Sequence, residues 1–229
     1  MLVLALVGCG SQSSEPANTI GDGFAGEAGE AARVELDEPT IPEDAPLVIF
    51  LGDSLSAGLH LSAEQAFPAA AQRLLAERGT PFRLVNAGVS GDTTAGGRSR
   101  IDWLLRQDPA VVVVELGAND GLRGQPVASV EGNLRGILER IDEAGAGAVL
   151  LGMDVPTSLG ADYVGDFREL YARLAEEFDV PLVARFLEGV GGEPSMNLPD
   201  GLHPTEEGHR KLAENLADEL QAALAAQAR

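Results

Sequence analysis

The clearest strand in this sequence is Val-Val-Val-Val-Glu-Leu at residues 111–116. Four consecutive valines leave no polar face, so other elements must cover this strand on both sides of its sheet. A helical pattern precedes the strand over residues 94–107, and another follows it over residues 129–144. Strands that alternate with helices are typical of a parallel sheet with helices on both faces.

The same alternation extends along the chain in both directions. The expected strands are residues 47–51, 82–86, 111–116, 148–153 and 181–186, and the expected helices are residues 67–79, 94–107, 129–144, 167–178 and 205–224. A strand followed each time by a helix predicts an α/β domain with right-handed crossovers. Ligands of such domains bind at the carboxyl ends of the strands, so segments that directly follow strands are the first candidates for a site.

The N-terminal residues differ in composition from this domain. Residues 1–7 are an apolar run too short to span a bilayer, and they lead into Leu6-Val7-Gly8-Cys9. Residues 10–46 are rich in Gly, Ala, Glu, Ser and Pro, a composition that cannot bury enough apolar surface to fold. We therefore expect a signal-like segment (1–9), an acidic flexible linker (10–46) and a folded domain (47–229).

Cys9 decides the expected location. Its context resembles the lipobox of bacterial lipoproteins, in which the peptide is cut before a cysteine that then carries lipid. This resemblance implies a lipid-anchored or periplasmic protein of the bacterial cell envelope. A signal peptide has a basic n-region, which residues 1–8 lack, and without a working signal the protein stays in the cytoplasm. Because Cys9 is the only cysteine, no internal disulfide is expected.

The formal net charge is −20 at pH 7. Such a surface repels phosphate backbones, so nucleic acid is not an expected partner. The chain has no metal-ligand spacing, phosphate-binding glycine loop or dinucleotide fingerprint, and we expect neither a metal nor another cofactor. His60, in a loop, and His209, on the last helix, are predicted to be surface residues.

Four short segments carry the groups that acyl hydrolysis requires. They are Gly52-Asp53-Ser54-Leu55-Ser56, Asn86-Ala87-Gly88-Val89-Ser90-Gly91-Asp92, Gly117-Ala118-Asn119-Asp120 and Asp200-Gly201-Leu202-His203-Pro204. A serine hydroxyl needs a base to take its proton. His203 can serve Ser54 in this way, and Asp200, three residues earlier, can fix the tautomer of the imidazole.

Acyl transfer also needs donors aimed at the developing oxyanion. The backbone N–H groups of Ser54 and Gly91 are candidates, since glycine lets a carbonyl approach the chain closely. The side-chain amide of Asn119 is the third. Taken singly, Ser54 could be a helix cap, and Asp200 and Asn119 could be ordinary turn residues. Four segments in one order favour the catalytic interpretation.

These four segments resemble those of the SGNH hydrolases, the GDSL-type esterase and lipase superfamily, and the resemblance covers residues 47–224. Residues 88–97 and 119–124 are especially similar to the bacterial branch with arylesterase, acyl-CoA thioesterase and lysophospholipase activities. The resemblance implies a flavodoxin-like three-layer α/β/α fold with five parallel strands, a shallow site and no cofactor. Ala118 departs from the pattern, because many relatives have a second glycine there.

We therefore expect a monomeric serine hydrolase of carboxylic esters or thioesters with short to medium acyl chains. By resemblance, residues 121–127 form one rim of the acyl site, with Leu122 and Pro126 as apolar contacts, and residues 155–165 form another wall. An envelope location favours lysophospholipids or other small esters over cytosolic acyl-CoA.

Three alternatives remain open. One is a carbohydrate O-deacetylase of the same superfamily. Another is a non-catalytic envelope lipoprotein that binds a small ligand, although such a binder has no need of Ser54, Asp200 and His203 together. The last is an unrelated nucleotide-binding protein, which Asp53 disfavours because it stands where a phosphate loop would be.

Overall fold

The central strand of the sheet is β3 (Val111–Glu115), whose residues are all buried in this computed structural model. The structure describes residues 40–228. The remaining strands are β1 (Leu47–Gly52), β2 (Arg83–Asn86), β4 (Gly147–Leu151) and β5 (Leu182–Val183). They form one sheet in the order β2-β1-β3-β4-β5, and every neighbouring pair is parallel. The predicted sheet of five parallel strands is confirmed, and its order is that of flavodoxin-like folds.

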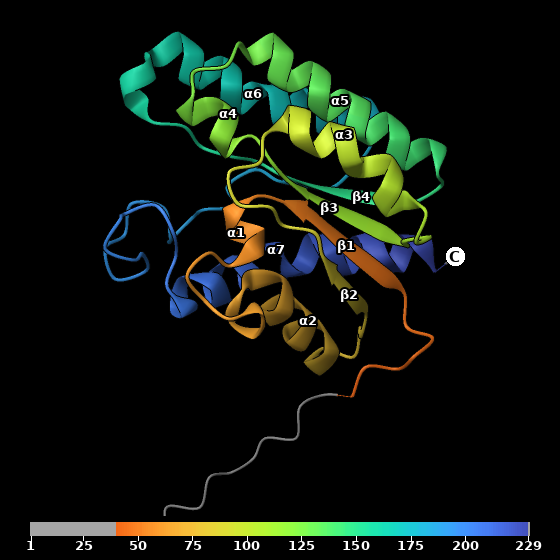
Figure 1. Ribbon diagram of the computed structural model, residues 1–229. Helices are drawn as coiled ribbons and strands as arrows, with labels where there is room; N and C mark the ends of the chain where they lie inside the picture. The colour runs from red at the N-terminus through yellow and green to blue at the C-terminus, as the bar shows by residue number, and fades with distance from the viewer. Residues whose placement is uncertain (1–39, 229) are drawn as a thin grey trace, which may run out of the picture. The chain divides into compact units, whose positions relative to one another are not determined.

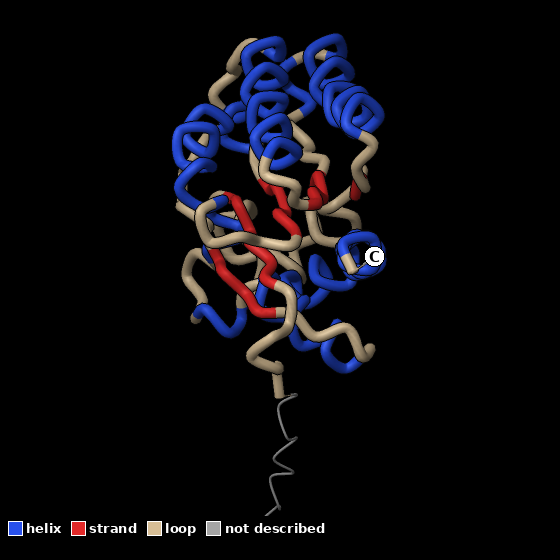
Figure 2. Tube along the Cα trace, turned by 90° about the vertical axis from the view of Figure 1, so that its right-hand side faces the viewer, coloured by secondary structure: helices blue, strands red, loops and turns tan. Residues whose placement is uncertain are grey.

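Helices cover both faces of this sheet. They are α1 (Ser54–Ala57), α2 (Phe67–Glu77), α3 (Thr94–Leu105), α4 (Ala118–Leu122), α5 (Val127–Glu143), α6 (Ala161–Phe178) and α7 (Glu206–Gln227), with short 3₁₀ helices η1 (Ala63–Gln65) and η2 (Thr157–Leu159). Figure 1 shows α3, α5 and α6 on one face and α2 and α7 on the other. The view turned by 90° shows the strands between these two helical layers (Figure 2). The expected three-layer α/β/α arrangement is confirmed.

The last helix illustrates how the sequence specifies these elements. Thr205 caps α7 by accepting a hydrogen bond from the backbone N–H of Gly208 at 3.2 Å. The leucines of its apolar stripe are all buried, namely Leu212, Leu216, Leu220 and Leu224.

Trp103 on α3 lies off the buried stripe of its helix and is 61% exposed. None of the described helices is long and apolar enough to cross a bilayer.

His209 on α7 corrects one prediction. The sequence predicts an exposed residue, but the side chain is only 1% exposed. Its Nδ1 accepts a hydrogen bond from the backbone N–H of Phe67 at 3.1 Å, and the two rings are stacked. His209 therefore fastens α7 to the first residue of α2. This contact between segments 142 residues apart cannot be inferred from the period of either helix.

The fifth strand is shorter than the predicted span of residues 181–186. After Val183 the chain turns, and the N–H of Glu188 donates to the carbonyl of Arg185 at 3.0 Å. Phe186 is fully buried although it lies outside the strand. Its apolar character therefore reflects packing in the core rather than pairing in the sheet.

The described chain begins shortly before β1. The N–H of Arg83 donates to the carbonyl of Pro46, and its Nε donates to the carbonyl of Ala45, both at 2.8 Å. These bonds attach the approach to β1 to the neighbouring strand. Cys9, the signal-like segment 1–9 and most of the expected linker 10–46 lie outside the described residues.

The register of β1 and β3 positions the site. Gly52 pairs with Glu115, so the two strands end side by side. Ser54, at the start of α1, and Asn119, in α4, follow these strand ends directly. A Cβ at Gly52 would collide with the Ser56 hydroxyl and with the Glu115 carboxyl, so only glycine permits this close approach.

Candidate active site

The structure brings together Ser54, His203 and Asp200. His203 Nε2 lies 3.1 Å from Ser54 Oγ, and His203 Nδ1 lies 2.7 Å from Asp200 Oδ2. With the imidazole proton on Nδ1, facing the carboxylate, Nε2 presents its lone pair to the serine hydroxyl. The candidate nucleophile, the candidate base and the carboxylate beside that base are thus joined by hydrogen bonds, although 149 residues separate Ser54 from His203.

A tight turn holds Asp200 beside the imidazole. Asp200 Oδ1 accepts hydrogen bonds from the backbone N–H groups of Leu202 at 2.9 Å and His203 at 3.0 Å. Gly201 has a φ of 70°, a left-handed conformation that favours glycine at this point. The bonds from His203 and Leu202 hold the pKa of the Asp200 carboxyl well below its usual range. Asp200 is therefore an anion throughout the pH range in which an esterase would be assayed.

Asn119 is held by a buried carboxyl group. Its Nδ2 donates to Asp53 Oδ2 at 2.8 Å, while Asp53 Oδ1 accepts from the N–H of Leu55 at 3.0 Å. Asp53 is 1% exposed, and this burial raises its pKa against the opposing effect of the two hydrogen bonds. Asp53 fixes one amide hydrogen of Asn119, which orients the other hydrogen of the same amide. This role of Asp53 was not predicted from the sequence, although a carboxyl next to the candidate nucleophile was a usable signal.

Glu115 supports the turn that carries Ser54. Its Oε2 accepts hydrogen bonds from the N–H of Asp53 at 3.1 Å, the N–H of Ser56 at 3.1 Å and the hydroxyl of Ser56 at 2.8 Å. Its Oε1 is buried without a hydrogen-bond partner in the described part of the chain. Burial, and then the neighbouring Asp53 carboxyl, raise the pKa of Glu115 well above its ordinary value. Burial of Glu115 therefore favours its protonated form over the anion.

Gly91 lies in an exposed turn between β2 and α3, with a φ of 80°. Its carbonyl accepts a hydrogen bond from Arg123 Nη2 at 3.0 Å, which links the turn to the residue that ends α4. A positive φ at this position favours glycine over other residues.

Arg100 on α3 fastens this loop to the end of β1. Its Nε donates to Asp92 Oδ2 at 2.9 Å, its Nη1 to the carbonyl of Ala87 at 2.6 Å and its Nη2 to the carbonyl of Gly52 at 3.0 Å. Arg100 could not be identified from the sequence, because a helical pattern does not show that one arginine joins the loop after β2 to the end of β1.

A cavity of about 350 Å³ opens beside Ser54. Asn119 and His203 contribute to its wall, and the apolar lining residues are Leu55, Ala118, Leu122, Val155, Pro156, Leu187, Val190, Leu202 and Pro204. Leu122 is 52% exposed at the rim. Pro126, the other expected acyl contact, directly precedes α5; it is exposed and does not line the cavity. Of the expected second wall, residues 155–165, only Val155 and Pro156 line it.

Comparisons with known proteins bear on this site. Residues 50–211 match the family described as GDSL-like Lipase/Acylhydrolase family. Esterase TesA of Pseudomonas aeruginosa is 42% identical over 173 residues, which cover 75% of this chain and 86% of that protein. Thioesterase 1/protease 1/lysophospholipase L1 of Escherichia coli K12 is 41% identical over 179 residues, covering 77% of this chain and 84% of that protein.

A solved structure agrees with these relatives. AlinE4, described as an SGNH-hydrolase family esterase, is 38% identical, with a TM-score of 0.67 over 80% of this chain and 98% of its own. The fold, the sequence match and the similar proteins thus point to one family. The chain belongs to the GDSL-like lipase/acylhydrolase family and is an SGNH-type hydrolase of carboxylic esters.

Proposed function

We propose that Ser54, His203 and Asp200 hydrolyse carboxylic esters and thioesters through an acyl-serine intermediate. The observation that carries the proposal is the unbroken hydrogen-bonded chain from Ser54 Oγ through His203 to Asp200, beside an apolar cavity. Asp200 keeps the imidazole proton on Nδ1 and stabilises the imidazolium that forms during turnover. A non-catalytic binder would have no use for this arrangement.

In the first half of the reaction, Ser54 Oγ attacks the carbonyl carbon while His203 Nε2 accepts the hydroxyl proton. The oxyanion receives hydrogen bonds from the N–H of Ser54, the N–H of Gly91 and the Asn119 amide hydrogen that Asp53 does not hold. His203 then gives its proton to the departing alcohol or thiol as the bond from carbon to that group breaks. The acyl group remains as an ester of Ser54.

In the second half, water attacks this ester. His203 accepts a proton from the water, and the same donors stabilise the second oxyanion. Collapse releases the carboxylic acid and returns the proton to Ser54 Oγ. Each turnover therefore consumes one ester and one water and requires no cofactor in these steps.

The cavity supports a short to medium acyl chain. Ligand sites range over roughly 300–1,000 Å³, and about 350 Å³ lies at the lower end of that range. Its lining is largely aliphatic, which suits an acyl chain better than a sugar ring. The relatives named esterase and lysophospholipase support small esters and lysophospholipids as substrate classes.

The proposed location rests on the sequence of residues 1–9. We propose a monomer anchored in the bacterial cell envelope by lipid on Cys9. Expression of the full chain in a bacterial host should place it in the membrane fraction, with the mass of Cys9 increased by a diacylglyceryl group. Cys9→Ser should move the protein to the soluble fraction. Equal membrane association of the two forms would exclude the anchor.

The experiment that tests the activity compares the full chain with Ser54→Ala on p-nitrophenyl esters from acetate to palmitate. Ser99→Ala, a change of the same kind at an exposed site on α3, is the matched control. We expect serine-dependent turnover with an optimum at short to medium chains. Turnover of acetate alone would favour a carbohydrate O-deacetylase. No turnover by a folded wild-type protein would favour the non-catalytic lipoprotein.

A further inference from the structure

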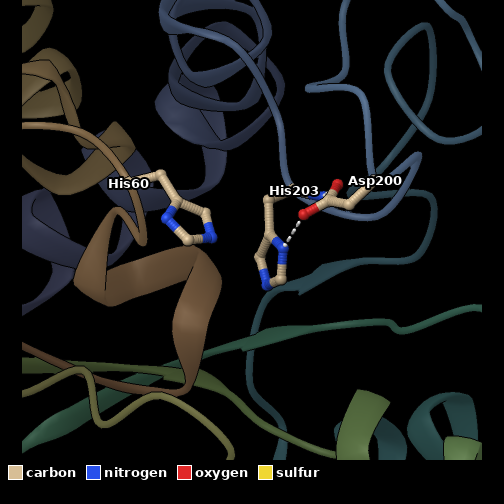
Figure 3. Close-up of side chains that lie close together, drawn as sticks. All are labelled: His60, Asp200 and His203. Carbon is tan, nitrogen blue, oxygen red and sulfur yellow. Dashed lines mark hydrogen bonds and ion pairs between the residues drawn. The ribbon is translucent and has the colours of Figure 1, made fainter.

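His60 faces the pair formed by His203 and Asp200. The two imidazole rings lie 5.8 Å apart between centroids and are nearly perpendicular. Figure 3 shows His60 approaching from the loop after α1, on the side of His203 away from Asp200. One nitrogen of each histidine and one oxygen of Asp200 lie within 4.8 Å of one another. The proposed reaction uses His203 and Asp200 but gives His60 no role.

The local backbone directs His60 toward this position. Gly58 ends α1 in the left-handed conformation, with a φ of 65°, and His60 itself has a φ of 73°. A positive φ is uncommon for a residue other than glycine, although histidine adopts it more readily than most. The N–H of Leu61 donates to the carbonyl of Gly58 at 2.8 Å and closes the turn around His60.

Two imidazoles and one carboxylate are a ligand set that suits zinc. Zinc takes nitrogen and carboxylate ligands at about 2.0–2.2 Å, and sites with three protein ligands leave one position for water. His60 is exposed, so rotation of its side chain can close the remaining separation. Magnesium and calcium prefer sites built from oxygen atoms, and this set offers them a single carboxylate. The net charge of −20 also raises the local concentration of divalent cations.

We infer that His60, His203 and Asp200 form an inhibitory site for a divalent transition-metal ion with the ligand preferences of zinc. Coordination through Nδ1 of His203, the nitrogen that faces Asp200, disables the base. The metal displaces the proton shared with Asp200, so the neutral imidazole carries its proton on Nε2 and cannot accept the proton of Ser54. Binding of the ion depends only on the three ligands, whereas the inhibition rests on the proposed function of His203.

The test measures zinc binding by isothermal titration calorimetry on the full chain without a histidine tag. Every protein carries Cys9→Ser, so that the thiol contributes no zinc ligand. We expect one ion per chain, and we expect His60→Ala to weaken binding by at least about tenfold, the lower bound seen when even an outer partner of a metal ligand is lost. Glu64→Gln, which removes an exposed carboxylate near the same loop, should bind zinc like the parent. No binding by the parent, or equal binding by His60→Ala, overturns the site.

The second readout is ester hydrolysis as a function of zinc concentration, with each variant normalised to its own metal-free rate. The half-inhibitory zinc concentration should rise by at least about tenfold in His60→Ala, as the affinity falls. Magnesium should not inhibit, and a chelator should restore the rate. Zinc binding by a protein that hydrolyses no ester would retain the metal site and reject the proposed function. Hydrolysis that zinc inhibits equally in the parent and in His60→Ala would reject the metal site and retain the function.

Discussion

In the proposed reaction Asn119 is an oxyanion donor, and the structure holds its side chain in place without substrate. An exposed amide would rotate and exchange partners with water, but Asp53 Oδ2 holds Asn119 Nδ2 at 2.8 Å. Asp53 is fixed in turn by Leu55 and by burial. Donors held in place before the reaction need no reorganisation as charge develops, which is why they contribute strongly to catalysis.

Substitution of Asn119 should therefore act on the chemical step. We expect Asn119→Ala to lower kcat by about 10²–10³, the range for loss of one oxyanion donor. KM should change little, because the bond strengthens in the transition state rather than in the substrate complex. Steady-state kinetics on a p-nitrophenyl ester, with unfolding by urea as a check of stability, would decide this. An unchanged kcat removes Asn119 from the oxyanion site.

Glu115 acts between elements, because it joins the end of β3 to the turn that leads into α1. Glu115→Gln keeps an oxygen that can accept all three hydrogen bonds, but its amide nitrogen takes the place of Oε1, which has no hydrogen-bond partner among the described residues. We therefore expect it to cost about 1–3 kcal/mol of unfolding free energy at pH 7, the penalty for burying an amide donor without an acceptor. Glu115→Ala leaves three donors without an acceptor and should cost at least about 3 kcal/mol.

The pH dependence provides an independent check of the charge on Glu115. Its pKa is raised in the folded state from an ordinary value of 4.5, so the unfolded chain loses this proton at lower pH than the folded chain. Stability contributed by the neutral group is present below pH 4.5 and declines above it. Glu115→Gln does not titrate, so its stability relative to wild type should increase as the pH rises above 4.5. A relative stability that falls with pH would show that Glu115 is buried as an anion.

His209 joins α7 to α2 and makes this contact sensitive to acid. Burial lowers the pKa of His209 from 6.5 to about 4. The unfolded chain therefore binds this proton first, and stability present above pH 6.5 is lost as the pH falls toward 4. A shift of this size corresponds to roughly 2–4 kcal/mol.

His209→Asn keeps an acceptor for the N–H of Phe67 but does not titrate. We expect lower stability at pH 7, because the stacking on Phe67 is lost. Between pH 6.5 and 4, however, the variant should lose roughly 2–4 kcal/mol less than wild type. Urea denaturation at each pH measures this difference. Parallel stability curves for the two proteins would contradict a buried neutral imidazole.

At the scale of the whole molecule, the net charge of −20 opposes compaction. The ion pairs on the surface, such as Arg78 with Asp218 and Arg140 with Asp102, are solvent-exposed and contribute little. Added salt should therefore weaken the repulsion between the acidic side chains more than it weakens the attraction within the surface ion pairs. We expect the Tm to rise when the ionic strength increases from about 0.01 M to 0.15 M, over which the Debye length falls from about 30 Å to 8 Å. A lower Tm in salt would mean that the ion pairs dominate.

The sequence predicts the layers and the position of the site because both follow from local patterns. Apolar runs of strand length alternate with helical periods, and the carboxyl ends of parallel strands meet at one edge of the sheet. This rule is enough to bring Ser54 and Asn119 close together. The spacing of Asp200 and His203 in one turn is equally local.

What the sequence does not reveal depends on contacts between distant segments. The burial of His209 requires the docking of α7 on α2, and the three bonds of Arg100 require the packing of α3 against the loop after β2 and the end of β1. The position of His60 depends on two left-handed residues in one turn. Periodicity and composition contain no information about such side-chain partners, so only the folded chain reveals them.

The most direct test of the central claim is covalent labelling with diethyl p-nitrophenyl phosphate followed by peptide mass spectrometry. An activated serine displaces p-nitrophenolate and retains the diethylphosphoryl group. We predict one label per chain, on Ser54, with loss of esterase activity in proportion to labelling and no label in His203→Ala. Inactivation with the label on another residue, or hydrolysis by a protein that remains unlabelled, would contradict the assignment of Ser54 as the nucleophile.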